Sequence, residues 1–181
     1  SGYPPAAVPQ APANHPTKTQ GMETTMNNWP QVSIDTVKSP NMCFCCGKDN
    51  PIGLKLDFTW DNGIARAEFT PNELYQGWAG ILHGGIISCL LDEGLTYATY
   101  FSGLDCITAK MQVRLRRPTL IGEPLVITSS IAKQSRRLIE TRATLSLKDG
   151  TPVAEGTATM FVIGSRENTD KEKRLDGDAR K

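Results

Sequence analysis

The sequence predicts an α+β domain in which an antiparallel sheet of about five to six strands is wrapped around one long central helix. Between Ile86 and Phe101, apolar residues recur at spacings of three and four, which is the period of a helix. The segments before and after this stretch alternate between apolar and polar residues, as half-buried strands do. A sheet that packs over a single helix hides the apolar surfaces of both.

Two strands are expected before the helix, at residues 54–60 and 64–69. The sequence Asp61-Asn62-Gly63 between them is a hairpin signal, since asparagine and glycine adopt the positive φ angles of a tight turn. A cysteine-rich segment precedes the first strand, and its Asn50-Pro51 and Gly53 interrupt the chain with turns.

Four strands are expected after the helix. In the first, odd-numbered apolar residues from Ile107 to Leu115 alternate with polar ones, which predicts one buried face and places Thr108 on the exposed face. Pro118 ends this strand. The later strands, at residues 125–131, 138–147 and 153–163, are separated by turns at Gly122-Glu123-Pro124 and Asp149-Gly150.

The two ends of the chain lack this patterning. Residues 1–36 are rich in proline and have little hydrophobic periodicity, so we expect a disordered N-terminal segment, and Ser1-Gly2 resembles a scar left by tag removal. Residues 37–163 form the predicted folded domain, for which a chain of 181 residues is long enough. Residues 164–181 carry mixed charges and are expected to be a flexible tail.

Charge and hydropathy argue against two kinds of partner. A formal net charge of +1 gives no sign of nucleic-acid binding. No stretch approaches the roughly 18 uninterrupted apolar residues of a membrane span, so no membrane partner is expected. The N-terminus has no basic-then-apolar signal peptide, which predicts a cytoplasmic protein.

The cysteines favour reduced thiols over a disulfide framework, because their number, five, is odd and three of them crowd together at Cys43, Cys45 and Cys46. Cys43 and Cys46 have the spacing of half a zinc site. No second pair follows, and the two histidines are His15 and His83. The sequence therefore predicts neither a metal site nor a cofactor.

The start of the helix carries the chemical signal. The first amide N–H groups of a helix lack intrahelical partners and lie at the positive end of its dipole. Gly84 and Gly85 leave these amides uncovered, so an anionic oxygen could approach them as in an oxyanion hole, although two glycines also suit a simple tight turn. After His83, Asp92 and Glu93 are the only acidic or basic residues of this apolar helix, and one of them is expected to line a cavity because a buried carboxylate is costly.

The combination of His83-Gly84-Gly85, an acid nine residues after the histidine, and the run from Thr108 to Pro118 resembles the PaaI-type hotdog-fold thioesterases. The resemblance covers roughly residues 43–163. It implies a hotdog fold that dimerises into a continuous sheet, as a dimer or a dimer of dimers, and hydrolysis of acyl-coenzyme A thioesters without a metal. Further matching residues lie in the cysteine-rich segment: Cys43-Phe44, Cys46-Gly47, Asn50-Pro51 and Gly53-Leu54.

The resemblance also implies roles for four residues. The Gly84 N–H polarises the thioester carbonyl, Asp92 activates water or attacks directly, and Thr108 positions the water. His83 supports the site by hydrogen bonding. The residues alone leave two alternatives open: a simple helix cap for His83, and a structural acid paired with an arginine for Asp92. Glu93 is turned about 100° from Asp92 around the helix and is expected to be structural, the alternative being that Glu93 is the acid used.

Substrate-binding candidates lie before the helix and on the later strands. Several family members carry an asparagine six residues before the histidine, where this sequence has Gly77 beside Gln76, whose amide is the candidate replacement. Trp78 and Gly85 complete this group. Arginines either hold the coenzyme's phosphates, which guanidinium groups match, or form a solvated strand face. The arginines in question are Arg114, Arg116, Arg117, Arg136 and Arg137, of which Arg116, Arg117 and Arg136 are the preferred candidates.

The alternative function is a non-catalytic acyl-coenzyme A binding or regulatory module with the same fold. A hotdog hydratase or dehydratase is disfavoured, because position 78, five before His83, is Trp78 and not an aspartate. Helix geometry adds one expectation about assembly. Gly84 and Asp92 are eight residues apart, hence about 12 Å along the helix, so the sequence predicts that Asp92 of one subunit serves Gly84 of the other.

Overall fold

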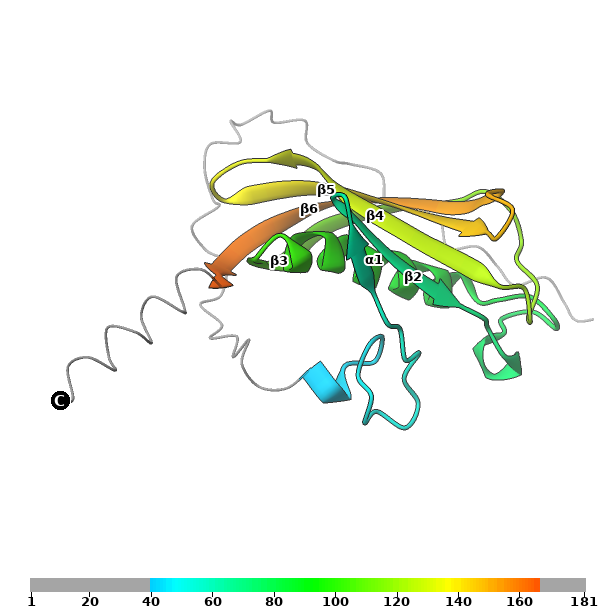
Figure 1. Cartoon of the computed structure of the whole chain (residues 1–181). Coiled ribbons are helices and arrows are strands. Elements are labelled where there is room, and N and C mark those ends of the chain that lie inside the picture. Colours follow the sequence, from blue (N-terminus) through cyan, green and yellow to red (C-terminus); the bar gives the residue numbers. More distant parts are fainter. Residues whose placement is uncertain (1–39, 167–181) are drawn as a thin grey trace, which may run out of the picture. The chain divides into compact units, whose positions relative to one another are not determined.

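The computed structural model describes residues 40–166, and Figure 1 shows one antiparallel sheet lying over a single long helix. The elements, in chain order, are the 3-10 helix η1 (Pro40–Met42), β1 (Thr59–Asp61), β2 (Ile64–Phe69), the 3-10 helix η2 (Glu73–Tyr75), α1 (Gly84–Phe101), β3 (Leu104–Leu115), β4 (Leu125–Gln134), β5 (Leu138–Leu147) and β6 (Pro152–Ser165). The six strands follow the order β1-β2-β4-β5-β6-β3. This architecture confirms the predicted fold class.

Helix α1 packs against the sheet through the face that the sequence period predicted. Leu90, Leu91 and Leu95 on this face are completely buried. The helix approaches β4 closely at Gly94, where a Cβ atom would lie 2.8 Å from the Ile127 side chain. The Ser129 hydroxyl also donates a 2.5 Å hydrogen bond to the Gly94 carbonyl. The glycine is therefore needed for packing, although it lowers helix propensity by about 1 kcal/mol.

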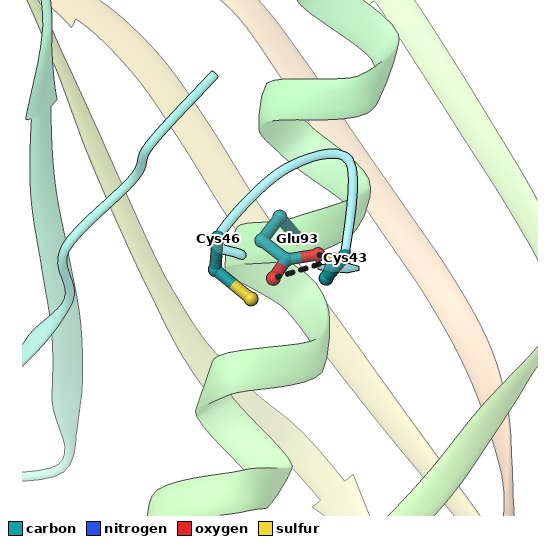
Figure 2. Close-up of side chains that lie close together, drawn as sticks. All are labelled: Cys43, Cys46 and Glu93. Carbon is teal, nitrogen blue, oxygen red and sulfur yellow. Dashed lines mark hydrogen bonds between the residues drawn. The ribbon is translucent and has the colours of Figure 1, made fainter. Parts of the chain in front are cut away.

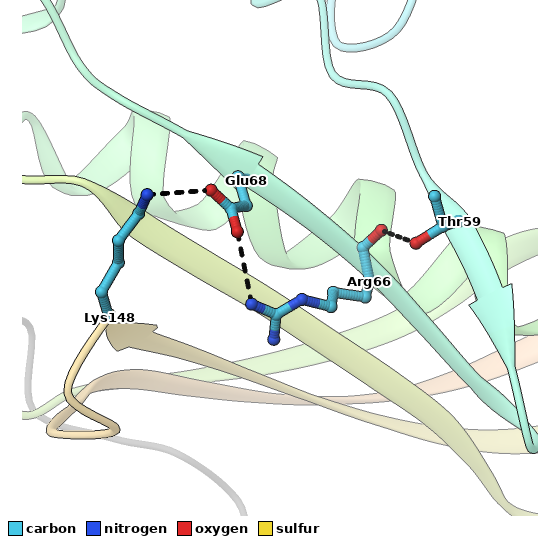
Figure 3. A network of polar contacts seen from close by, with 4 residues as sticks. All are labelled: Thr59, Arg66, Glu68 and Lys148. Carbon is cyan, nitrogen blue, oxygen red and sulfur yellow. Dashed lines mark hydrogen bonds and ion pairs between the residues drawn. The ribbon is translucent and has the colours of Figure 1, made fainter.

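The predicted hairpin between the first two strands is confirmed. Asp61 pairs with Ile64, and the two residues between them have positive φ angles of 48° at Asn62 and 82° at Gly63, as a type I′ turn requires. Figure 3 shows a surface network on β2, in which Glu68 lies 3.4 Å from Arg66 and 3.2 Å from Lys148 in the β5–β6 turn. These side chains are exposed, so the network contributes little to stability.

The first strand is shorter than predicted: residues 54–58 do not join the sheet. The backbone N–H groups of Leu54 and Leu56 donate instead to the carbonyls of Phe44 and Cys45, at 2.8 and 2.9 Å. Lys55 between them has a positive φ of 58°, which interrupts an extended strand. The alternating burial that suggested a strand is real, but its hydrogen bonds go to the preceding loop, which we call the cysteine loop (residues 43–53).

A β-bulge divides β3 and overturns the predicted alternation. Thr108 pairs with Met160 and Lys110 pairs with Thr159, so Ala109 has no residue opposite it. An extra residue reverses the side-chain alternation of a strand. After the bulge, Met111 packs on the core, as expected. Before the bulge, Thr108 faces α1. The prediction that Thr108 lies on the exposed face with its polar neighbours was wrong for this reason.

Strand β3 lies at one end of the sheet, where it pairs with β6 alone among the described residues. Strand β6 runs to Ser165, two residues past its predicted end.

The predicted N-terminal segment and all but the first three residues of the predicted tail lie outside the described residues. None of the helices between residues 40 and 166 has the length and apolarity needed to cross a membrane.

Candidate active site

The start of α1 leaves one backbone donor free. The Gly85 N–H donates to Nδ1 of His83 at 2.9 Å, and the His83 carbonyl accepts from the N–H groups of Ile86 and Ile87 at 2.9 and 3.2 Å. The Gly84 N–H has no acceptor anywhere in the part of the chain that the structure describes. Of the first four amides of the helix, it alone remains available to polarise an oxygen of a ligand.

His83 is the N-cap of α1. Because its Nδ1 accepts a hydrogen bond, the proton of the neutral ring resides on Nε2. Two glycines make room for the ring: a Cβ atom would lie 2.9 Å from Nδ1 if added at Gly85 and 3.1 Å from Cδ2 if added at Gly77. The imidazole therefore caps the helix, while the neighbouring Gly84 amide stays uncovered. The supporting role of His83 in catalysis stays a prediction.

A pocket of about 380 Å³ opens beside this amide. Its lining residues are Gly77, Trp78, Ile81, Leu82, His83 and Gly84. Of the predicted substrate-binding residues, Gly77 and Trp78 therefore share a pocket with the predicted oxyanion donor. Trp78 is 85% exposed, so its indole is free to contact a ligand.

Gln76 and Gly85 were predicted to contact substrate, but both have partners within the chain. The Gln76 side-chain oxygen accepts from the Gly80 N–H at 3.1 Å and so shapes the loop before the pocket. The amide of Gly85 is taken by His83. Neither residue lines the pocket.

Asp92 and Thr108 are brought together by the bulge in β3. The Thr108 hydroxyl donates a 3.0 Å hydrogen bond to Oδ1 of Asp92, and both side chains are partly buried. No arginine among residues 40–166 forms an ion pair with Asp92. The carboxylate is therefore held by a hydroxyl and not by an arginine.

Glu93, the next residue, contacts the cysteine loop instead (Figure 2). The Cys43 thiol lies 3.9 Å from Oε1 and 4.0 Å from Oε2 of Glu93. Burial raises the pKa of Glu93, and burial also raises the pKa of the nearby Cys46 thiol to about 12. The two adjacent acids of α1 thus have different surroundings, as expected from their rotation around the helix.

The three candidate arginines differ in their partners. Arg116 lies 2.6 Å from Glu155, and its guanidinium lowers the pKa of that carboxyl, while Arg117 lies 3.9 Å from Glu123. Arg136 is exposed and forms no ion pair with any described residue. Arg136 is therefore the one of the three whose guanidinium is free for an anionic ligand.

Comparisons with known proteins place the chain in a family. A model of the thioesterase superfamily matches residues 79–154, which include Gly84, Asp92 and Thr108. Human acyl-coenzyme A thioesterase 13 is 30% identical over 103 residues, covering 55% of this chain and 74% of that protein.

Solved structures agree with the fold. The PaaI protein of the Escherichia coli phenylacetic acid degradation operon superposes with a TM-score of 0.60 at 22% identity, over 66% of this chain and 85% of that one. A hypothetical thioesterase from Streptococcus pneumoniae, solved with coenzyme A, superposes with a TM-score of 0.59 at 21% identity, over 61% of this chain and 88% of that one. These structures show the PaaI-type hotdog fold, and the human relative and the family model show that the chain belongs to the thioesterase superfamily.

Proposed function

We propose that the protein hydrolyses acyl-coenzyme A thioesters to a free acid and coenzyme A. The observation that carries this proposal is the unpaired Gly84 N–H, which lies at the positive end of α1 and lines a pocket of about 380 Å³. Membership of the thioesterase superfamily and the human relative's name, acyl-coenzyme A thioesterase 13, support the choice of substrate class.

The first catalytic role belongs to Gly84. A thioester carbonyl bound at this N–H gains negative charge on its oxygen as a tetrahedral intermediate forms. A backbone amide that is already oriented stabilises this charge without reorganisation, and the loss of one such donor typically costs about 10²–10³ in kcat. Trp78 lines the same pocket and is the proposed contact for the acyl group or the adjoining thiol arm.

The second role belongs to Asp92, the proposed general base. The Thr108 hydroxyl holds Oδ1, which leaves Oδ2 to take a proton from water. The hydroxide that results bonds to the carbonyl carbon, the intermediate collapses, and the carbon–sulfur bond breaks. Coenzyme A leaves as a thiolate and takes up the proton that Asp92 received from water, which restores the carboxylate. Because a thioester is already activated, one oriented water, one carboxylate and one oxyanion donor suffice.

We further propose that each site is shared between two subunits. Gly84 and Asp92 lie eight residues apart on α1, which places their backbones about 12 Å apart along the axis, beyond the reach of an aspartate side chain. The Thr108 contact brings Asp92 close to β3, an edge strand of 12 residues with one side unpaired among the described residues. A second copy that pairs along this edge would approach the carboxylate, and two-fold symmetry would create two equivalent sites.

The coenzyme's phosphates are expected to contact arginine. Arg136 is the preferred candidate because Arg116 and Arg117 already have carboxylate partners. The proposed compartment is the cytoplasm, since five free thiols suit a reducing environment.

Free thiol release from a panel of acyl-coenzyme A substrates tests the function. We expect turnover by the wild type and by Asp57→Asn, a control for an exposed acid, and strongly reduced turnover by Asp92→Asn. Saturable binding of the same substrates by the wild type, without any release of thiol, would instead identify a binding or regulatory module.

A further inference from the structure

In the folded chain, the Glu93 carboxylate lies next to Cys43 and Cys46, the two cysteines with the spacing of half a zinc site. Cys43 and Cys46 lie in the cysteine loop, whereas Glu93 lies in the middle of α1. Their two sulfur atoms and one carboxylate oxygen all lie within 4.8 Å of one another. Figure 2 shows the Glu93 carboxylate between the two cysteines, beneath the arch of the loop.

The spacing of these atoms is close to that of a tetrahedral metal site. Zinc binds sulfur at about 2.3 Å and carboxylate oxygen at about 2.0–2.2 Å, so neighbouring ligands of a tetrahedral ion lie about 3.6–3.8 Å apart. The Cys43 sulfur already lies 3.9 Å from one Glu93 oxygen. Two soft thiolates also favour zinc over calcium or magnesium, which prefer sets of oxygen ligands.

The local backbone is shaped to hold the two thiols together. The Gly47 N–H donates to the Cys43 carbonyl at 2.9 Å, and a Cβ atom at Gly47 would lie only 2.4–2.5 Å from backbone atoms of Asn41 and Cys43. Only glycine fits this tight turn directly after Cys46. The Lys55 ammonium donates to three carbonyls of the same loop, among them that of Gly47 at 3.0 Å, which fastens the turn further.

Glu93 also has no positively charged partner among residues 40–166. This carboxylate is partly buried, and no lysine or arginine among the described residues forms an ion pair with it. The ammonium group of Lys55 donates to carbonyls of the cysteine loop and not to Glu93. The groups that contact Glu93 are thiols of the cysteine loop, and a bound divalent cation would stabilise the charged forms of both the carboxylate and the thiols.

We propose that Cys43, Cys46 and Glu93 bind one zinc ion, with water as the fourth ligand. Each thiol that becomes a ligand releases its proton to solvent. The ion ties the cysteine loop to α1 and so fixes the following segment, whose Leu54 and Leu56 belong to the hydrophobic core. Because Glu93 is turned about 100° away from Asp92, the zinc stabilises the fold and takes no part in hydrolysis.

The proposal is tested on the full chain, purified with a reductant and loaded with zinc sulfate. Elemental analysis after dialysis should find one zinc per chain in the wild type, and zinc should raise the melting temperature by mass action. Cys43→Ser and Cys46→Ser should each abolish both effects. Glu93→Gln should weaken zinc binding at least about tenfold. Cys106→Ser, which removes a thiol on β3 outside the cluster, is the matched control and should behave as the wild type.

Cobalt identifies the ligands independently of stability. The cobalt-loaded wild type should show the visible bands of a tetrahedral site and a thiolate charge-transfer band, which the two serine variants lose. The proposal is wrong if folded wild type takes up no more zinc than the folded double variant Cys43→Ser/Cys46→Ser. It is also wrong if mass spectrometry of the wild type, purified with a reductant and mixed with zinc, finds a Cys43–Cys46 disulfide and no metal. Thiol release from acyl-coenzyme A, measured on the same samples, reports on hydrolysis separately.

Discussion

The hydroxyl of Thr108 donates a 3.0 Å hydrogen bond to the Asp92 carboxylate, from an edge strand to the middle of the central helix. The bond exists because the bulge at Ala109 turns Thr108 toward α1. It fixes one carboxylate oxygen and leaves the other free, which is the arrangement that a general base requires.

Asp92→Asn should keep the fold and substrate binding, because asparagine has the same size and can still accept from Thr108. Loss of the proton acceptor should lower kcat by at least about 10²-fold. Steady-state thiol release and circular dichroism measure the two properties. Near-normal turnover in a folded Asp92→Asn protein would remove Asp92 from the mechanism.

Thr108→Val and Thr108→Ser separate hydrogen bonding from packing. A hydrogen bond to a charged group contributes about 1.5–3 kcal/mol, so valine should lower kcat about tenfold or more, with a smaller effect on KM. Serine restores the hydroxyl and should recover most of the activity. If serine is as inactive as valine, the methyl group and not the hydroxyl of Thr108 matters.

The two glycines at the start of α1 should respond differently to alanine. At Gly85 a Cβ atom would meet the His83 ring at 2.9 Å and break the cap, which should cost about 1 kcal/mol of stability. At Gly84 a Cβ atom would meet only the tip of Leu115 at 3.2 Å, and this side chain can move. Denaturant unfolding of both variants should therefore show the larger loss for Gly85→Ala, and equal losses would argue against the capping role.

The Arg116–Glu155 pair predicts a small pH dependence of stability. Arg116 lowers the pKa of Glu155 below its ordinary value of 4.5. The unfolded chain is then protonated first as the pH falls, so the contribution of the pair is complete above about pH 4.5 and is lost as the pH falls through the lowered pKa. Glu155→Gln should flatten the acid end of a plot of melting temperature against pH. Curves for the wild type and the variant that stay parallel throughout would contradict the pairing.

The elements that could be predicted from the sequence are those whose conformation depends on residues close by in the chain. The helix follows from its apolar period, and the hairpin follows from Asn62-Gly63, because both depend on neighbouring residues. The bulge in β3 could not be predicted, since it depends on the register with β6, some 50 residues later in the chain. For the same reason the sequence showed Cys43 and Cys46 as half a site, whereas Glu93 joins them only through the fold.

The shared active site is tested most directly by mixing two inactive variants, Asp92→Asn and Gly84→Pro. Proline removes the proposed oxyanion donor and suits the first position of a helix, and His83 before it has the extended backbone (φ −65°, ψ 133°) that proline requires. Heterodimers isolated through two different tags should carry both lesions in one site and leave the other intact, so we predict about half the wild-type activity per dimer. Fully exchanged heterodimers that stay as inactive as their folded, dimeric parents would contradict a site built from Gly84 of one subunit and Asp92 of the other.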